Sequence, residues 1–145
     1  PRPWVEPLVT MAVNGHTCVP PFIQRAGIAA LTGPQDLVAA QIAAYRERRD
    51  VLVRGLNALR GVSCPVPAGA FYVFPDFSTL LAERGITSRA FANRLLEKYG
   101  VALIDGAAFG RRGEGRVRIS FASARADLDA AVMRIGEAVS ELERQ

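Results

Sequence analysis

The sequence predicts an α+β fold in which a small mixed or antiparallel sheet of about four strands is covered by helices. Several long segments repeat apolar residues at intervals of three and four, which is the period of an amphipathic helix. Between them lie short runs rich in β-branched and aromatic residues, which are typical of strands. A layered α+β arrangement is the most economical way to bury both kinds of apolar face.

The N-terminal part is predicted to be helical after an irregular start. Three prolines fall within residues 1–19, so we expect only a short helix there, over 7–13. A proline pair favours a helix over 22–31, which a Thr-Gly-Pro sequence ends. Residues 35–59 carry the longest apolar stripe, interrupted at Arg49, and are expected to form one helix of about 35 Å. The interruption disfavours a coiled coil, and the length would suit a connection between two bodies.

The C-terminal part is predicted to alternate strands with helices. The expected elements are two short β runs joined by a Pro/Gly turn over 62–75, a helix over 88–99, a buried strand over 101–104, a strand over 116–121 and a helix over 125–143. Ser88 is expected to cap the first of these helices and Ser123 the second, because a serine hydroxyl accepts hydrogen bonds from free amides at a helix start.

The segment from 106 to 123 is the strongest candidate for a binding site. A glycine-rich loop containing Arg111 and Arg112 leads into an alternating strand, with apolar side chains on one face and guanidinium groups on the other. Because the loop precedes a strand, its glycines suit a mobile turn better than a nucleotide cradle. Arg118 lies among predicted core elements, so its partly buried guanidinium needs a partner, and a carboxylate is the best one. Residue types alone leave open whether that carboxylate belongs to a ligand or to an internal Asp or Glu.

Several classes of function are disfavoured by what the sequence lacks. His16 is the only histidine and is expected to lie in a turn, so no Ser-His-Asp or Cys-His set can form without it. Cys18 and Cys64 are far apart and have no metal-ligand spacing, which indicates a reduced, cytoplasmic chain without a metal site. The net charge of +4 comes from arginines scattered among acids, which disfavours nucleic acid as a partner. No apolar run approaches the roughly 20 residues of a membrane span.

Three ordered segments together resemble a known family. They read PPFIQRAGIAALTGPQD, CPVPAGAFYVFPDF and GVALIDGAAFGRRGEGRVRISFA. In this order they resemble the C-terminal part of class I/II pyridoxal-phosphate (PLP) aminotransferases, the aspartate aminotransferase superfamily of fold type I. The resemblance implies that residues 1–34 are a remnant of the large domain, that 35–60 form the connecting helix, and that 61–145 form the C-terminal small domain.

The same resemblance implies an activity in amino-acid metabolism and biosynthesis. Such enzymes are homodimers that use PLP to move an amino group from an amino acid to a 2-oxo acid. It implies that Arg118 binds the substrate α-carboxylate and that Phe71 lies in a turn facing the substrate side chain, although an aromatic strand is equally explained as core. It also implies that residues 16–19 lie near the subunit interface and that the homodimer forms through the large domain.

The chain departs from the family in one major respect. The lysine that carries the cofactor lies, in the family, before the part present here, so no catalytic residue and no certain cofactor ligand are predicted in this chain. Lys98 is the only lysine among 18 basic residues; it does not match the family motif, and we expect it to be solvated at a helix end. The chain is therefore expected to be roughly the last third of an enzyme and inactive alone. The alternative is a stand-alone, non-catalytic module that binds carboxylates or another subunit.

Overall fold

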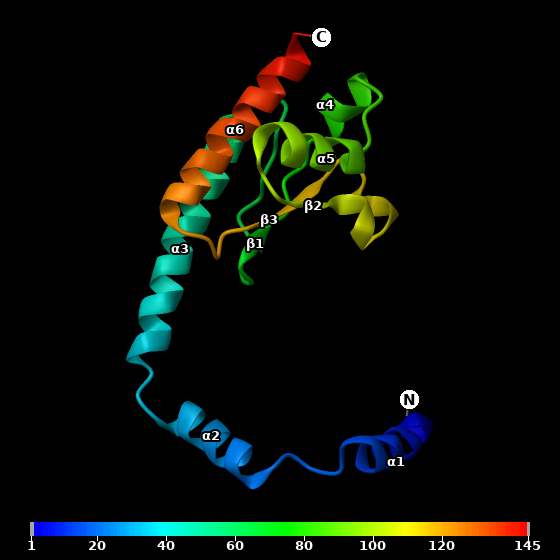
Figure 1. The fold of residues 1–145 in the computed structure, drawn as a ribbon, viewed down its shortest axis with the longest axis vertical. Coiled ribbons are helices and arrows are strands. Elements are labelled where there is room, and N and C mark those ends of the chain that lie inside the picture. Colours follow the sequence, from blue (N-terminus) through cyan, green and yellow to red (C-terminus); the bar gives the residue numbers. More distant parts are fainter. Residues whose placement is uncertain (1, 145) are drawn as a thin grey trace. The chain divides into compact units, whose positions relative to one another are not determined.

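The α+β class is confirmed by a computed structural model, which describes residues 2–144 (Figure 1). Contacts between residues divide the chain into two compact units, Pro1–Ala39 and Ala40–Gln145. The boundary falls within the long helix α3, Asp36–Asn57, which confirms the single helix predicted over 35–59.

The first unit consists of helices without a core of their own. It contains a 3₁₀ turn, η1 (Arg2–Trp4), followed by α1 (Val5–His16) and α2 (Pro21–Thr32). Helix α1 is longer than expected because its proline lies in the first turn, where a missing amide costs little. None of the described side chains of these three elements is buried. Its large apolar side chains are exposed: Trp4, Val5, Leu8, Val9, Met11, Val13, Val19, Phe22, Ile23, Ile28, Leu31, Leu37 and Val38.

The sheet of the second unit has three strands in the described residues, not about four. The strands are β1 (Tyr72–Val73), β2 (Ile104–Asp105) and β3 (Val117–Ser120), in the order β1-β3-β2, and both pairings are antiparallel. The expected β run over 62–67 provides only an isolated bridge between Ser63 and Asp76. It contains two prolines, which have no amide to donate to a longer ladder.

Three helices of the second unit share one core with this sheet. They are α4 (Ser78–Glu83), which the sequence did not suggest, α5 (Ser88–Tyr99) and α6 (Arg125–Glu143). Helix α6 lies beside the C-terminal half of α3 (Figure 1), and a Cβ on Gly55 would lie 2.8 Å from Cγ1 of Val132. The buried face of β3 joins this core through Val117 and Ile119, which are 0% and 5% exposed.

Both predicted helix caps are wrong. Helix α5 is capped by Thr87, whose hydroxyl accepts a hydrogen bond from the Ala90 amide at 3.2 Å. Ser88 is buried instead, and its hydroxyl accepts from the Gly115 amide at 2.8 Å. Helix α6 has Ala124 in the cap position and no side-chain cap, so Ser123 stands one residue too early. Within residues 2–144, no helix combines the length and hydrophobicity that crossing a bilayer would need.

Candidate functional site

Strand β3 presents Arg118 on the sheet face opposite the core, as the alternating pattern predicts. Its neighbours Val117 and Ile119 are buried, whereas Arg118 is half-buried. The strand lies between β1 and β2, and Arg118 pairs in register with Ile104 of β2. The position of the arginine is therefore fixed by a central strand with pairing on both sides.

The guanidinium of Arg118 contacts aromatic rings and no carboxylate. Its Cζ lies over the ring of Tyr72, 5.3 Å from the centroid, and over the ring of Phe109, 5.0 Å from the centroid. Among residues 2–144, no Asp or Glu forms an ion pair with Arg118, and none of its N–H groups donates a hydrogen bond to a described residue. The internal carboxylate that the sequence left open is thus not found in this part of the chain.

Arg116, two residues earlier, is paired with a carboxylate of the chain itself, in contrast to Arg118. Its guanidinium lies 2.8 Å from Oδ2 of Asp76, and its Nε donates to the same oxygen at 3.1 Å. Burial alone would raise the pKa of Asp76, but hydrogen bonds from Ser78 and Arg116 hold that pKa below its ordinary value. Arg116 therefore serves the fold, by tying the start of β3 to the segment after β1.

A shallow depression adjoins Arg118 on the outer face of the sheet. It has a volume of about 270 Å³ and is lined by Ala102, Leu103, Ile104, Arg118 and Ser120. Its walls are mostly apolar, so the guanidinium is the one full charge that it offers to a ligand among the described residues. Such a site suits a small anionic group more than a large polar molecule.

Phe71 lies just before β1 and is exposed, not part of the core. Its side chain is 55% exposed, and its ring meets that of Tyr72 edge to face with 5.8 Å between centroids. Its carbonyl accepts a hydrogen bond from the Phe121 amide at 2.9 Å, which holds the residue next to the end of β3. The rings found over the guanidinium of Arg118 are those of Tyr72 and Phe109, and Phe71 is linked to them only through its contact with Tyr72.

The glycine-rich loop contains short helical turns and hydrogen bonds to neighbouring segments. It forms two 3₁₀ helices, η2 (Gly106–Phe109) and η3 (Arg111–Gly113). The Gly106 amide donates to the Arg116 carbonyl at 2.8 Å, and the Ser88 amide donates to Oε1 of Glu114 at 2.7 Å. Hydrogen bonds from Ser88 lower the pKa of Glu114 below its ordinary value. Its tandem arginines are exposed, and among the described residues they form no ion pair.

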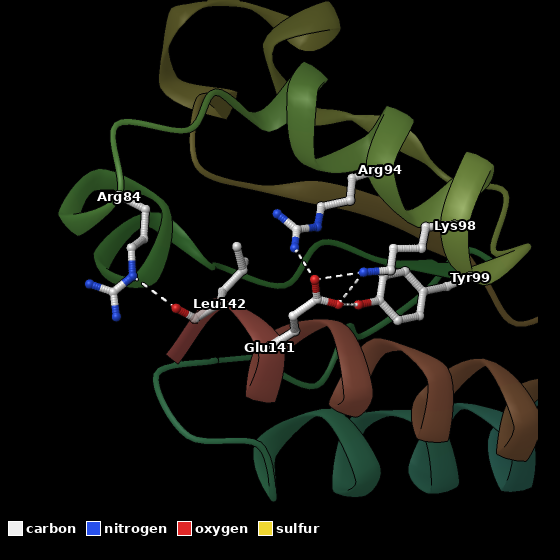
Figure 2. Close-up of polar contacts among 6 residues, drawn as sticks. All are labelled: Arg84, Arg94, Lys98, Tyr99, Glu141 and Leu142. Carbon is white, nitrogen blue, oxygen red and sulfur yellow. Dashed lines mark hydrogen bonds and ion pairs between the residues drawn. The ribbon is translucent and has the colours of Figure 1, made fainter. Parts of the chain in front are cut away.

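Lys98 is engaged in an ion-pair cluster at the C-terminal end of α6 and is not simply solvated (Figure 2). Its Nζ lies 2.6 Å from both carboxylate oxygens of Glu141. Arg94 donates to the same carboxylate at 2.8 Å, and the Tyr99 hydroxyl donates to Oε2. These hydrogen bonds, from Lys98 first and Tyr99 second, lower the pKa of Glu141 to about 2, and the bond to Glu141 raises the pKa of Tyr99.

We expect the Glu141 cluster to make the second unit sensitive to acid. Because the pKa of Glu141 falls from 4.5 to about 2 on folding, its stabilising effect is complete above pH 4.5 and is lost as the pH falls toward 2. Glu141→Gln should lower the free energy of unfolding at neutral pH. It should also flatten the loss of that free energy between about pH 5 and about pH 2.5.

Urea unfolding at a series of pH values, followed by tyrosine circular dichroism, measures this effect. Glu137→Gln is the matched control, since Glu137 is exposed on the same helix and forms no ion pair with a described residue. If the free energy of unfolding depended on pH in the same way in both variants, the stabilising role of the Glu141 cluster would be contradicted.

The other candidate residues do not gather into a reactive site. His16 ends helix α1 and is exposed, as is Cys18. Cys64 is buried, and burial raises the pKa of its thiol to about 11. No group of three or more His, Cys, Asp or Glu side chains within residues 2–144 is placed to hold a metal ion.

Tyr72 and Phe109 are the site residues that sequence reasoning missed. Tyr72 alternates with the buried Val73 in β1, and this alternation could have placed it on the face of Arg118. Phe109 had no such signal, because its position depends on the 3₁₀ fold of the glycine-rich loop.

Comparisons of sequence and of structure with known proteins all identify aminotransferases. The family model described as aminotransferase class I and II matches residues 9–135. An aspartate aminotransferase from Rhizobium meliloti (strain 1021) is 36% identical over 98% of this chain, and an LL-diaminopimelate aminotransferase from Moorella thermoacetica is 39% identical over 96%. The crystal structure of the aspartate aminotransferase from Rhizobium meliloti matches 97% of this chain and 36% of its own, with a TM-score of 0.84 and 35% identity. The chain spans about a third of the length of these curated relatives, 36% and 34%.

Proposed function

Since the chain belongs to the aminotransferase class I and II family, whose members depend on PLP, we propose that it is the C-terminal part of such an enzyme. In this proposal the complete enzyme moves an amino group from an amino acid to a 2-oxo acid. The part played by this chain is to bind the α-carboxylate of the substrate through Arg118.

The proposed domain organisation has three parts, and the division between the two units falls inside its connecting helix. Residues 1–34 would belong to the large domain, 35–60 would form the connecting helix, and 61–145 would form the small domain. The exposed apolar side chains of residues 2–39 support this proposal, because helices without a core need further protein to cover them. The same feature disfavours a stand-alone carboxylate-binding module. We further propose that the enzyme is a homodimer held together through the large domain.

One observation carries the proposed role of Arg118. Its guanidinium sits on a fixed strand beside a depression, and no described residue neutralises it or uses its N–H donors. A planar carboxylate can accept two parallel hydrogen bonds from such a group. Binding of this kind would hold the substrate in one orientation, so that its amino group and Cα–H are presented to the catalytic groups. Phe71, exposed next to the start of β1, is proposed to border the substrate side chain.

The residues of this chain do not fit the covalent attachment of PLP. That attachment needs a lysine with a free amino group, and the ammonium of Lys98, the one lysine of the chain, is held by Glu141. PLP, when bound, supplies the electron sink for amino-group transfer. We therefore propose that the lysine that carries the cofactor lies in another part of the enzyme, and that this chain alone is inactive.

Substitution of Arg118 in the full-length enzyme tests the proposed role. Arg118→Ala should weaken the binding of the amino-acid substrate by about 1.5–3 kcal/mol, or roughly 10- to 150-fold, because a charge-assisted pair is lost. Arg118→Lys should restore only part of this affinity, since an ammonium cannot form the bidentate pair. Equilibrium titration with the amino acid gives the dissociation constants.

Arg116→Ala is the control for this test. It removes the same charge two residues away, but its guanidinium is already paired with Asp76. We expect this variant to lose some stability and to keep its substrate affinity. Substrate affinity that is unchanged in Arg118→Ala would refute the carboxylate role.

A further inference from the structure

We infer that Tyr72 and Phe109 are positioning residues for Arg118, which hold its guanidinium by cation–π contact while leaving its N–H donors available to the substrate carboxylate. This inference rests on the proposed function of Arg118 and adds two residues to the site. The observation behind it is that the Cζ of Arg118 lies 5.3 Å and 5.0 Å from the two ring centroids. Both distances are within the range of an energetically significant cation–π contact.

The register of the sheet places Tyr72 next to the guanidinium of Arg118. In β1, Tyr72 lies opposite Ser120 and Val73 opposite Ile119. Since alternate residues face opposite sides, Tyr72 shares the outer face with Arg118, as its diagonal neighbour across the strand pair. Val73 is 1% exposed and anchors the strand in the core, so the ring of Tyr72 cannot slip to the other face without moving a buried residue.

Phe109 is positioned by the 3₁₀ helix η2, which follows β2, the neighbour of β3 on the side away from β1. Oδ1 of Asp105 accepts a hydrogen bond from the Ala108 amide at 3.1 Å, which caps this helix. The ring of Phe109 also meets that of Phe74 edge to face, with centroids 5.9 Å apart. Phe109 is nevertheless 53% exposed, so its ring does not serve mainly to fill the core. Its placement is better explained by its contact with Arg118.

An aromatic partner leaves the charge and the N–H donors of a guanidinium available to a ligand, whereas an internal carboxylate does not. An Asp or Glu would accept hydrogen bonds from the guanidinium edge and neutralise its charge, as Asp76 does for Arg116. An aromatic ring attracts the cation with the negative potential of its face and accepts no conventional hydrogen bond. Tyr72 and Phe109 can therefore restrict the arginine and leave its charge and planar N–H fork free for a ligand. Restricting the side chain beforehand lowers the entropy lost on binding.

The test compares two ligands in the full-length enzyme. One is L-aspartate, or the amino acid that the wild-type enzyme binds most tightly. The other is the corresponding amine without the α-carboxylate, which is β-alanine in the case of aspartate. The ratio of their affinities isolates the contribution of the α-carboxylate, whereas a general disturbance of the fold would weaken both ligands alike.

Ring removal should lower this ratio. We expect the double variant Tyr72→Leu/Phe109→Leu to reduce it roughly five- to tenfold, since both cation–π contacts are lost while apolar volume is largely kept. Tyr72→Phe retains the ring and should leave the ratio within about twofold of wild type. Both positions are exposed, so folding should survive; if the double variant does not fold, Phe109→Leu alone decides, with a reduction of roughly two- to fivefold.

The outcomes separate the inference from the proposed function. A ratio that collapses in Arg118→Ala but is unchanged by ring removal would overturn the positioning role and leave the function of Arg118 intact. An equal loss of affinity for both ligands in the double variant would also overturn it, because it indicates a merely structural role. A ratio that is unchanged in Arg118→Ala would instead refute the proposed function itself.

Discussion

Replacement of Gly113 by alanine is expected to destabilise the second unit by roughly 3 kcal/mol or more. A Cβ at this position would overlap the carbonyl oxygen of Gly106, and a Cβ on Gly106 would in turn overlap the carbonyl oxygen of Gly113. The two backbones thus touch directly where η2 and η3 meet. Since the obstructing atoms are backbone and not the end of a flexible side chain, the loop itself must move to admit the methyl group.

The measurement is urea unfolding followed by the near-ultraviolet circular dichroism of tyrosine. All three tyrosines, Tyr45, Tyr72 and Tyr99, lie in the second unit, so the tyrosine contribution to this signal comes from that unit. Gly69→Ala is the control, because a Cβ there would meet no atom within 4 Å. Its free energy of unfolding should stay within about 0.5 kcal/mol of wild type. Equal midpoints for the two variants would show that the contact between the glycines is not close.

Leu95→Ala is expected to have the second large effect, a loss of about 2–5 kcal/mol of unfolding free energy. Leu95 is fully buried on helix α5 and belongs to the core that unites α5 with the sheet and α6. Truncation would remove apolar contacts and leave a cavity whose walls cannot fully collapse in a close-packed interior.

The next residue of the helix supplies a matched control. Leu96 is 55% exposed, so Leu96→Ala makes the same chemical change in the same helix without opening a cavity. Its effect should be within about 0.5 kcal/mol. The two variants should differ in urea midpoint and share the wild-type slope with denaturant. Similar losses for both would contradict the packing of α5 described here.

The long amphipathic helices could be predicted from the sequence because their signals are local, whereas the short helix α4 was not. Residues 88–99 and 125–143 carry apolar stripes of helical period, and the structure has helices with those bounds. The strands could be predicted only in part, since pairing depends on partners distant in sequence. The run over 62–67 looks like a strand by composition, yet its prolines and its place beside Asp76 limit it to one bridge.

In the candidate site, too, local sequence patterns predicted some features, and contacts between distant residues determined the others. Alternation within residues 116–121 was sufficient to place Arg118 on the open face. Its contact with Phe109 was not predictable, because Phe109 reaches it through a loop whose fold depends on the close approach of two glycine backbones. Lys98 shows the same limit, since its partner Glu141 lies 43 residues later, on another helix.

The bond from the Ser88 amide to Glu114 links the start of one helix to a residue 26 positions away. The hydroxyl of the same serine receives the amide of Gly115, so the two segments exchange hydrogen bonds in both directions. The Ser88 amide, in the first turn of α5, therefore has a hydrogen-bond acceptor only when Glu114, in the segment leading into β3, packs against it. The first turn of this helix is thus tied to the segment that leads into the strand bearing Arg118, and these bonds require closure of a loop between residues distant in sequence.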